Sequence, residues 1–208
     1  FWFGKQGNEP RIDGDESTIQ TAIQWLEQRT SNKPWAMWVP LLAPHPPFMV
    51  EDPWFTLHNR DSMPEPIRPE DTTGKPEYMN ELRKRYGWAD LSIEDHAEIT
   101  ATYYGMVSRV DDQLGRLLLA IDQFGYADNT YTFCFSDHGE YLGDHGLVEK
   151  WPSGLDPCLV QNPLIVAGPK VTESEVAHSG VEMIDLLPTC LEIAETEASH
   201  THFGKSLL

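Results

Sequence analysis

Thr130-Tyr-Thr-Phe-Cys-Phe135 runs directly into Ser136-Asp-His-Gly139. The first stretch is β-branched and aromatic apart from its cysteine, a composition typical of a strand. The residues after it are polar or small, as in a loop. In α/β proteins, ligand sites gather where strands end in such loops. We therefore expect Asp137 and His138 to lie at the carboxyl edge of a sheet.

A similar pattern occurs earlier in the chain. Trp35-Ala-Met-Trp-Val-Pro-Leu-Leu42 is a nearly continuous apolar run, and it ends at Ala43-Pro-His-Pro-Pro47. This run predicts a buried strand that delivers His45 to a loop. The flanking prolines restrict the backbone, so the imidazole has a fixed direction that would suit proton transfer. The alternative is a rigid turn that contains a histidine without a function.

Amphipathic helices are expected between the strands. Apolar residues recur every three or four positions from Asp13 to Thr30, where Ser17-Thr-Ile-Gln20 has the form of a capping box. The same period continues from Ser92 to Phe124, and Gly125 follows as a C-terminal cap.

Two further elements complete the pattern. Pro163–Ala167 is a short apolar run that predicts another strand, and 181–194 predicts a helix interrupted by Pro188. Helices that alternate with buried strands favour an α/β fold with a largely parallel sheet. We expect a single domain over 1–208, with an irregular surface rim at 49–91.

Composition narrows the classes of function. The 208 residues include 33 acidic and 15 basic side chains, so the formal net charge is −18. This charge argues against a nucleic-acid partner, because phosphate contacts need clustered Lys and Arg. No apolar run approaches the roughly 20 residues of a membrane helix. The three cysteines lack C-x-x-C spacing, and we expect them to be small buried apolar side chains. Their pattern favours a reducing, cytoplasmic interior, although the beginning of the chain carries no targeting pattern to decide this.

The loop after Phe135 is rich in groups that could carry chemistry. Asp137 and His138 are adjacent, so a carboxylate oxygen and an imidazole nitrogen could bind one cation; the alternative is a capping Asp and a packed His. Lys150 could hold an anionic group if the loop folds back over this pair, and is otherwise a solvated charge. Asp144 and His145 are more readily explained as structural residues.

Several stretches together resemble the sulfatase family of the alkaline phosphatase superfamily. The resemblance is carried by Ala43–Phe48, Thr130–Lys150 and Asn162–Pro169, with support from Tyr103–Gly115, Met183–Thr189 and Phe203–Leu207. It implies an α/β/α sandwich that hydrolyses sulfuric esters with one divalent cation, commonly calcium. By the same resemblance, Asp137 and His138 are metal ligands, His45 helps to protonate the leaving oxygen, and Lys150 holds the sulfate. The implied substrate is a sulfated small molecule or carbohydrate.

One part of the family pattern is missing from the sequence. The family nucleophile is a formylglycine made from a Cys/Ser-x-Pro/Ala-x-Arg motif, and none of Cys134, Cys158 and Cys190 begins one. We therefore expect an internal portion of a sulfatase that is inactive alone, with the formylglycine in a preceding segment. Manganese is an alternative to calcium, because imidazole is a softer ligand than the family's Asn. Two alternative functions are a phosphonate monoester or phosphodiester hydrolase of the same superfamily, and a non-catalytic binding module or degenerate homologue.

Overall fold

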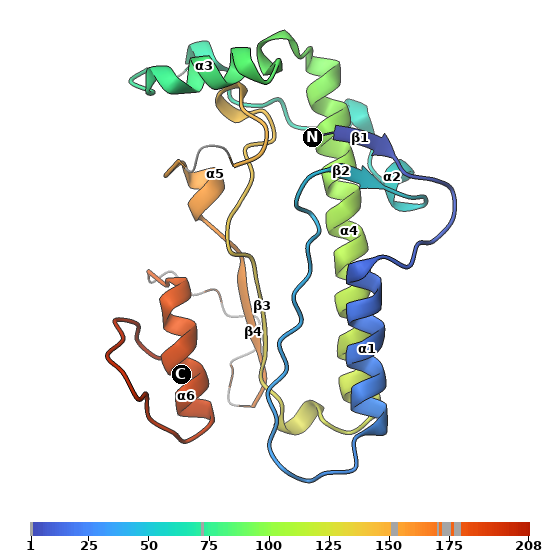
Figure 1. Cartoon of the computed structure of the whole chain (residues 1–208), viewed down its shortest axis with the longest axis vertical. Coiled ribbons are helices and arrows are strands. Elements are labelled where there is room, and N and C mark those ends of the chain that lie inside the picture. The colour runs from blue at the N-terminus through green and yellow to red at the C-terminus, as the bar shows by residue number, and fades with distance from the viewer. Residues whose placement is uncertain (1, 72, 151–153, 170, 172–175, 177–179) are drawn as a thin grey trace. The chain divides into compact units, whose positions relative to one another are not determined.

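A computed structural model describes residues 2–71, 73–150, 154–169, 171, 176 and 180–208 (Figure 1). The chain forms two compact units, the first comprising Phe1–Ala127 with His138–Gln161 and the second Asp128–Asp137 with Asn162–Leu208. Helices and strands alternate along the chain, so the predicted α/β class is confirmed. The assignment of 1–208 to a single domain stays a prediction. No helix among the described residues is long and apolar enough to cross a bilayer.

The long helix α4 (Ile93–Gln123) is the scaffold of the first unit. Ser92 and Asp95 form a reciprocal capping box at its start, and Gly125 follows its end with a φ of 76°. Both ends of the predicted helix are therefore confirmed, because a side-chain cap and a left-handed glycine satisfy the terminal backbone groups.

Helix α1 (Gly14–Gln28) lies along α4 (Figure 1). Its N-cap is Asp13, whose carboxylate accepts a hydrogen bond from the Glu16 amide at 2.9 Å. The predicted capping box at Ser17 is wrong, because Ser17 lies inside the helix and the earlier Asp already caps it. The apolar face is as predicted and forms a buried cluster of Ile19, Ala22, Leu26, Leu117 and Ala120.

The run Trp35–Leu42 is not a buried strand, contrary to the prediction. It has no strand hydrogen bonding among the described residues, and partly buried and exposed positions alternate along it. The partly buried side chains pack on the α1–α4 cluster: Trp35, Met37, Val39 and Leu41. The run is therefore extended and has one apolar face, but a strand also needs a hydrogen-bonded neighbour. The nearby strand is β2 (Phe48–Val50), which pairs in parallel with β1 (Trp2–Lys5).

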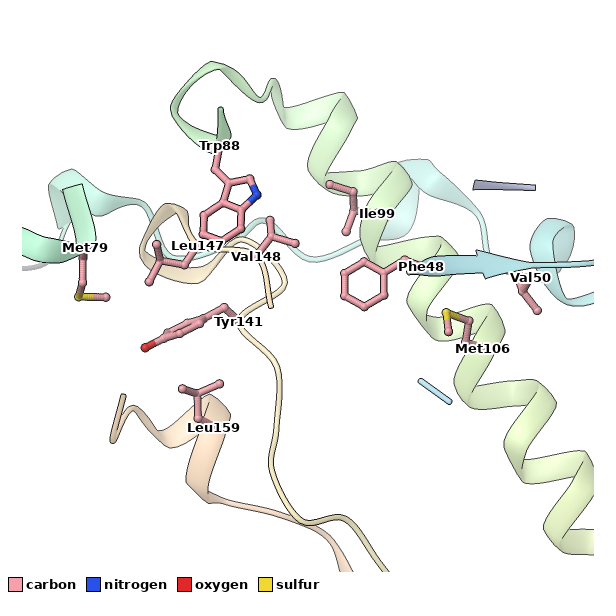
Figure 2. Close-up of a cluster of buried hydrophobic side chains, with 10 residues drawn as sticks. All are labelled: Phe48, Val50, Met79, Trp88, Ile99, Met106, Tyr141, Leu147, Val148 and Leu159. Atoms are coloured by element: carbon pink, nitrogen blue, oxygen red, sulfur yellow. The ribbon is translucent and has the colours of Figure 1, made fainter. Parts of the chain in front are cut away.

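The predicted rim at 49–91 contains short helices: α2 (Trp54–Leu57), η1 (Arg60–Ser62), η2 (Pro69–Asp71), α3 (Glu77–Arg85) and η3 (Trp88–Asp90). It is not only a surface excursion, because Met79 and Trp88 are buried in the larger core of this unit. Figure 2 shows Trp88 beside Leu147 and Val148, which belong to the loop after His138. The rim therefore supports the loop that ends at Lys150.

The second unit contains the remaining strands. β3 (Thr132–Phe135) and β4 (Leu164–Ala167) match the predictions and pair antiparallel. Helix α6 (Leu186–Ile193) follows η6 (Met183–Asp185). Pro188 does not interrupt α6, because it lies in the first turn, where backbone amides lack intrahelical acceptors. The other short elements are η4 (Ala127–Asn129), η5 (Asp144–Gly146) and α5 (Pro157–Val160).

A charged pair joins α1 to α4. The Arg116 guanidinium donates to both carboxylate oxygens of Glu16, at 2.9 and 2.6 Å. These hydrogen bonds outweigh burial and lower the pKa of Glu16 to about 2. The ionised form is thus favoured by folding, so its contribution is present above the ordinary carboxyl pKa and is lost as the pH falls toward 2.

We expect Glu16→Gln to lower the free energy of unfolding of the full-length protein by about 1 kcal/mol at pH 7, since the pair is partly solvated. The difference from wild type should shrink below about pH 4.5, because the unfolded wild-type chain then takes up a proton on this carboxyl that the folded protein binds only near pH 2. Urea denaturation between pH 7 and pH 3 measures it. A difference that persists unchanged at pH 3 would contradict the role of the charge.

Candidate active site

The turn that carries His45 is held by a buried carboxylate. Asp15, in the first turn of α1, is 7% exposed and accepts hydrogen bonds from the amides of Leu42 and Ala43 at 2.9 and 2.8 Å. The His45 amide donates to the Leu42 carbonyl at 2.9 Å, which closes the turn. The direction of the imidazole therefore depends on α1 as well as on the local prolines. Sequence patterns did not indicate Asp15, because an acidic residue early in a helix is common for electrostatic reasons alone.

The contacts of His45 indicate which of its ring nitrogens carries the proton. Its Nδ1 lies 2.8 Å from the Pro46 carbonyl, which can only accept, so we assign the proton to Nδ1. Its Nε2 lies 2.8 Å from Lys150 Nζ. The ammonium donates to the Nε2 lone pair in this arrangement. Lys150 thus folds back onto His45, and its role in holding an anionic group stays a prediction.

His138 lies beside the same pair. Its ring makes an edge contact with the His45 ring, with centroids 6.1 Å apart, and its Nδ1 is 2.8 Å from the Gly139 carbonyl. The backbone here is fixed by α5, since the Gly139 amide donates to the Leu159 carbonyl at 2.8 Å. A Cβ at Gly139 would overlap the Cys158 carbonyl, so only glycine fits after His138.

Glu149 is a site residue that the sequence did not indicate. Its side chain is 3% exposed, and its Oε1 lies 3.2 Å from Lys150 Nζ and 3.7 Å from His45 Nε2. Its other oxygen, Oε2, is buried and has no hydrogen-bond partner among the described residues. Its φ of 69° is in the left-handed region. A glutamate beside a lysine ordinarily predicts a solvated surface pair, so the sequence carries no signal for this burial.

A second acidic residue lies beneath this loop. Burial raises the pKa of Glu140 to about 7, against the hydrogen bonds that its carboxylate accepts from the amides of Leu142 and Glu149. The charge of Glu149 raises it further. Glu140 therefore organises the backbone that places Glu149 and Lys150.

Asp144 and His145 are structural, as expected. The Asp144 carboxylate accepts from the Ile67 amide at 2.8 Å, and the buried His145 ring packs against Tyr141. None of the three cysteines is fully buried and Cys190 is exposed, so the expectation of small buried apolar side chains is wrong.

Asp137 is the last residue of its segment in the second unit, directly before His138. Its carbonyl accepts from Asn162 Nδ2 at 3.2 Å. The two side chains offer oxygen and nitrogen donors, and the hydrogen bond at His138 Nδ1 is the type that orients a ligating imidazole through Nε2. No group of three His, Cys, Asp or Glu residues in the described part of the chain could hold a metal. The assignment of Asp137 and His138 as metal ligands stays a prediction.

A paired lysine and histidine beside a second histidine, on loops of an α/β protein, form a site suited to a tetrahedral anionic ester. A model of the family described as Sulfatase matches residues 4–196. The chain belongs to the sulfatase family, within the alkaline phosphatase superfamily. The family resemblance noted in the sequence is thereby confirmed, and it implies a divalent metal and a formylglycine in general.

Individual relatives agree with this assignment. The multifunctional alkaline phosphatase superfamily protein PehA of Trinickia caryophylli is 31% identical over 93% of this chain and 40% of its own length. An arylsulfatase of Clostridium perfringens is 26% identical over 97% of this chain and 42% of its own. The solved phosphonate monoester hydrolase SpPMH from Silicibacter pomeroyi matches with a TM-score of 0.77 and 25% identity, over 95% of this chain and 44% of that one. The chain spans about two-fifths of the length of these curated relatives.

Replacing the Asp15 anchor tests the support of the His45 turn. In Asp15→Asn the side-chain oxygen can still accept one of the two backbone hydrogen bonds. The side-chain NH2 cannot accept the other, because it is itself a donor, so we expect the free energy of unfolding to fall by about 1–3 kcal/mol. Amide hydrogen exchange at Leu42 and Ala43 should accelerate at least tenfold. The exposed Asp112→Asn is the control, since Asp112 only pairs with Arg116 on the surface of α4. Equal exchange in both variants would contradict the anchoring role.

Proposed function

We propose that the full-length protein hydrolyses sulfuric esters, with His45 and Lys150 as catalytic residues. The observation that carries the proposal is the 2.8 Å contact of Lys150 Nζ with His45 Nε2, beside His138, in a member of the sulfatase family. The substrate class is a sulfated small molecule or carbohydrate.

The charge and the leaving group of a sulfate ester indicate what Lys150 and His45 would each do. The terminal oxygens of a sulfate ester carry one negative charge, which the Lys150 ammonium can hold, and the departing oxygen needs a proton. In the arrangement observed, His45 Nε2 accepts from Lys150 and so carries no proton of its own. His45 therefore acts as an acid only after Nε2 takes up a proton, and the Glu149 carboxylate at 3.7 Å would stabilise the resulting imidazolium.

Asp137 and His138 are the residues of this chain that would hold the metal. The bound cation would add positive charge where the sulfate oxygens lie, and the family's formylglycine would supply the nucleophile. Calcium is the proposed metal, with manganese as the alternative favoured by the His138 nitrogen. A reducing, cytoplasmic location is part of the proposal, because the three cysteines lack the spacing of a disulfide framework.

Two alternatives are testable beside the leading one. The phosphonate monoester hydrolase SpPMH, with its TM-score of 0.77, favours phosphonate monoester or phosphodiester hydrolysis as a second activity. A non-catalytic binding module would bind such anions without turnover.

Activity of the full-length protein tests the catalytic pair. With p-nitrophenyl sulfate as substrate, we expect His45→Gln and Lys150→Ala each to lower kcat/KM by about 10²–10³-fold, because each removes a proton donor or a charge from the transition state. Lys84→Ala, which removes an exposed lysine of α3, is the control. Wild-type turnover of p-nitrophenyl phenylphosphonate alone would support the second activity, and turnover of neither ester would support the binding module.

Metal affinity tests the ligand assignment. We expect His138→Ala to weaken calcium binding by the full-length protein at least tenfold in isothermal titration calorimetry, because one donor is lost. His200→Ala, at an exposed position near the end of the chain, is the matched control. Unchanged calcium and manganese affinities in His138→Ala would remove this residue from the ligand set.

A further inference from the structure

Glu149 places a negative charge next to the group proposed to hold the substrate. Its Oε1 is 3.2 Å from Lys150 Nζ, and its side chain is 3% exposed. Water therefore screens this carboxylate poorly, and its field reaches any anion that contacts Lys150. A site that only had to attract anions would bind them more tightly without the Glu149 carboxylate.

The local structure carries a cost to keep this side chain. A φ of 69° is unfavourable for glutamate and free of strain for glycine. The buried Oε2 has no hydrogen-bond partner in the described part of the chain, which is a further cost. Strained, incompletely satisfied residues of this kind concentrate at functional sites. Glycine would fit the backbone better, so the carboxylate itself has a role.

We propose that Glu149 is a specificity-determining residue that restricts the site to substrates with a single negative charge. This inference rests on the proposed function, in which Lys150 holds the anionic group. Repulsion from the carboxylate scales with the charge of the substrate, so a dianionic phosphate monoester is penalised about twice as strongly as a monoanionic sulfate ester. The carboxylate thus supplies discrimination by an unfavourable contact with the wrong substrate.

Two esters with the same leaving group test the proposal. p-Nitrophenyl sulfate is a monoanion, and p-nitrophenyl phosphate is a dianion at pH 8, since its second pKa is about 6. In the full-length, metal-loaded enzyme, we expect Glu149→Gln to raise the ratio of kcat/KM for phosphate over sulfate on the order of tenfold. Glu149→Gly should raise the ratio similarly while its Tm stays equal to or above that of wild type, because the strain at φ is relieved.

Glu51→Gln is the matched control. Glu51 is also a buried glutamate paired with a cation, with its Oε1 2.8 Å from Arg109 Nε. Its loss should lower Tm without changing the ratio. If Glu51→Gln changed the phosphate-to-sulfate ratio of kcat/KM as much as the Glu149 variants do, the effect would come from general destabilisation, and the proposal would be overturned.

Binding separates this inference from the proposed hydrolysis. Phenyl sulfate and phenyl phosphate are titrated into the same variants, and the ratio of their Kd values should shift toward phenyl phosphate in Glu149→Gln and Glu149→Gly. An inactive wild type would overturn the hydrolase assignment while the binding ratio still decides the role of Glu149. Unchanged ratios in both Glu149 variants would overturn the role of Glu149 alone.

Discussion

The hydrogen bonds from the amides of Leu42 and Ala43 to the carboxylate of Asp15 are the constraint on which the geometry of the candidate site depends. They tie an extended run that lacks strand pairing to the first turn of α1, and α1 is in turn packed on α4. The turn with His45 thus inherits the rigidity of a helix pair. The apolar contacts of Trp35–Leu42 alone determine which face of this run is buried, but they would let the run slide along its own axis. Without the hydrogen bonds to Asp15, the 2.8 Å distance between His45 Nε2 and Lys150 Nζ would therefore not be fixed.

The residues that the sequence indicates are those whose chemistry and local pattern agree. His45 follows an apolar run, His138 follows a strand, and the structure brings the two rings into edge contact. Lys150 had an ordinary surface interpretation from composition alone, and only the family resemblance raised it above that. The end of β3 was predictable because the change from an apolar run to a polar loop is a local property of the sequence. The pairing of Lys150 with His45 was not, because it joins positions 105 residues apart.

The parts that could not be predicted are those in which tertiary contacts override local preference. Trp35–Leu42 has the composition of a strand, but the hydrogen-bonded neighbour that defines a strand is not a property of its own sequence. Helix α3 has a single buried residue, Met79, so its sequence lacks the repeating apolar pattern that would predict a helix. Glu149 is a buried glutamate with a positive φ. Glutamate is rarely buried, and residues other than glycine rarely have a positive φ, so general rules predict neither feature. Departures from local consistency of this kind are expected where function is selected.

The net charge of this chain gives Glu149 a particular significance. A chain of net charge −18 repels anions at long range, so attraction for an anionic ester has to come from the few positive groups at the site. Long-range repulsion acts through solvent and is screened by salt, so it separates monoanions from dianions weakly at physiological ionic strength. The buried carboxylate acts within a few ångströms of Lys150, where little solvent intervenes. Discrimination by substrate charge is therefore a property of the local pair and not of the overall field, and it should persist at high salt.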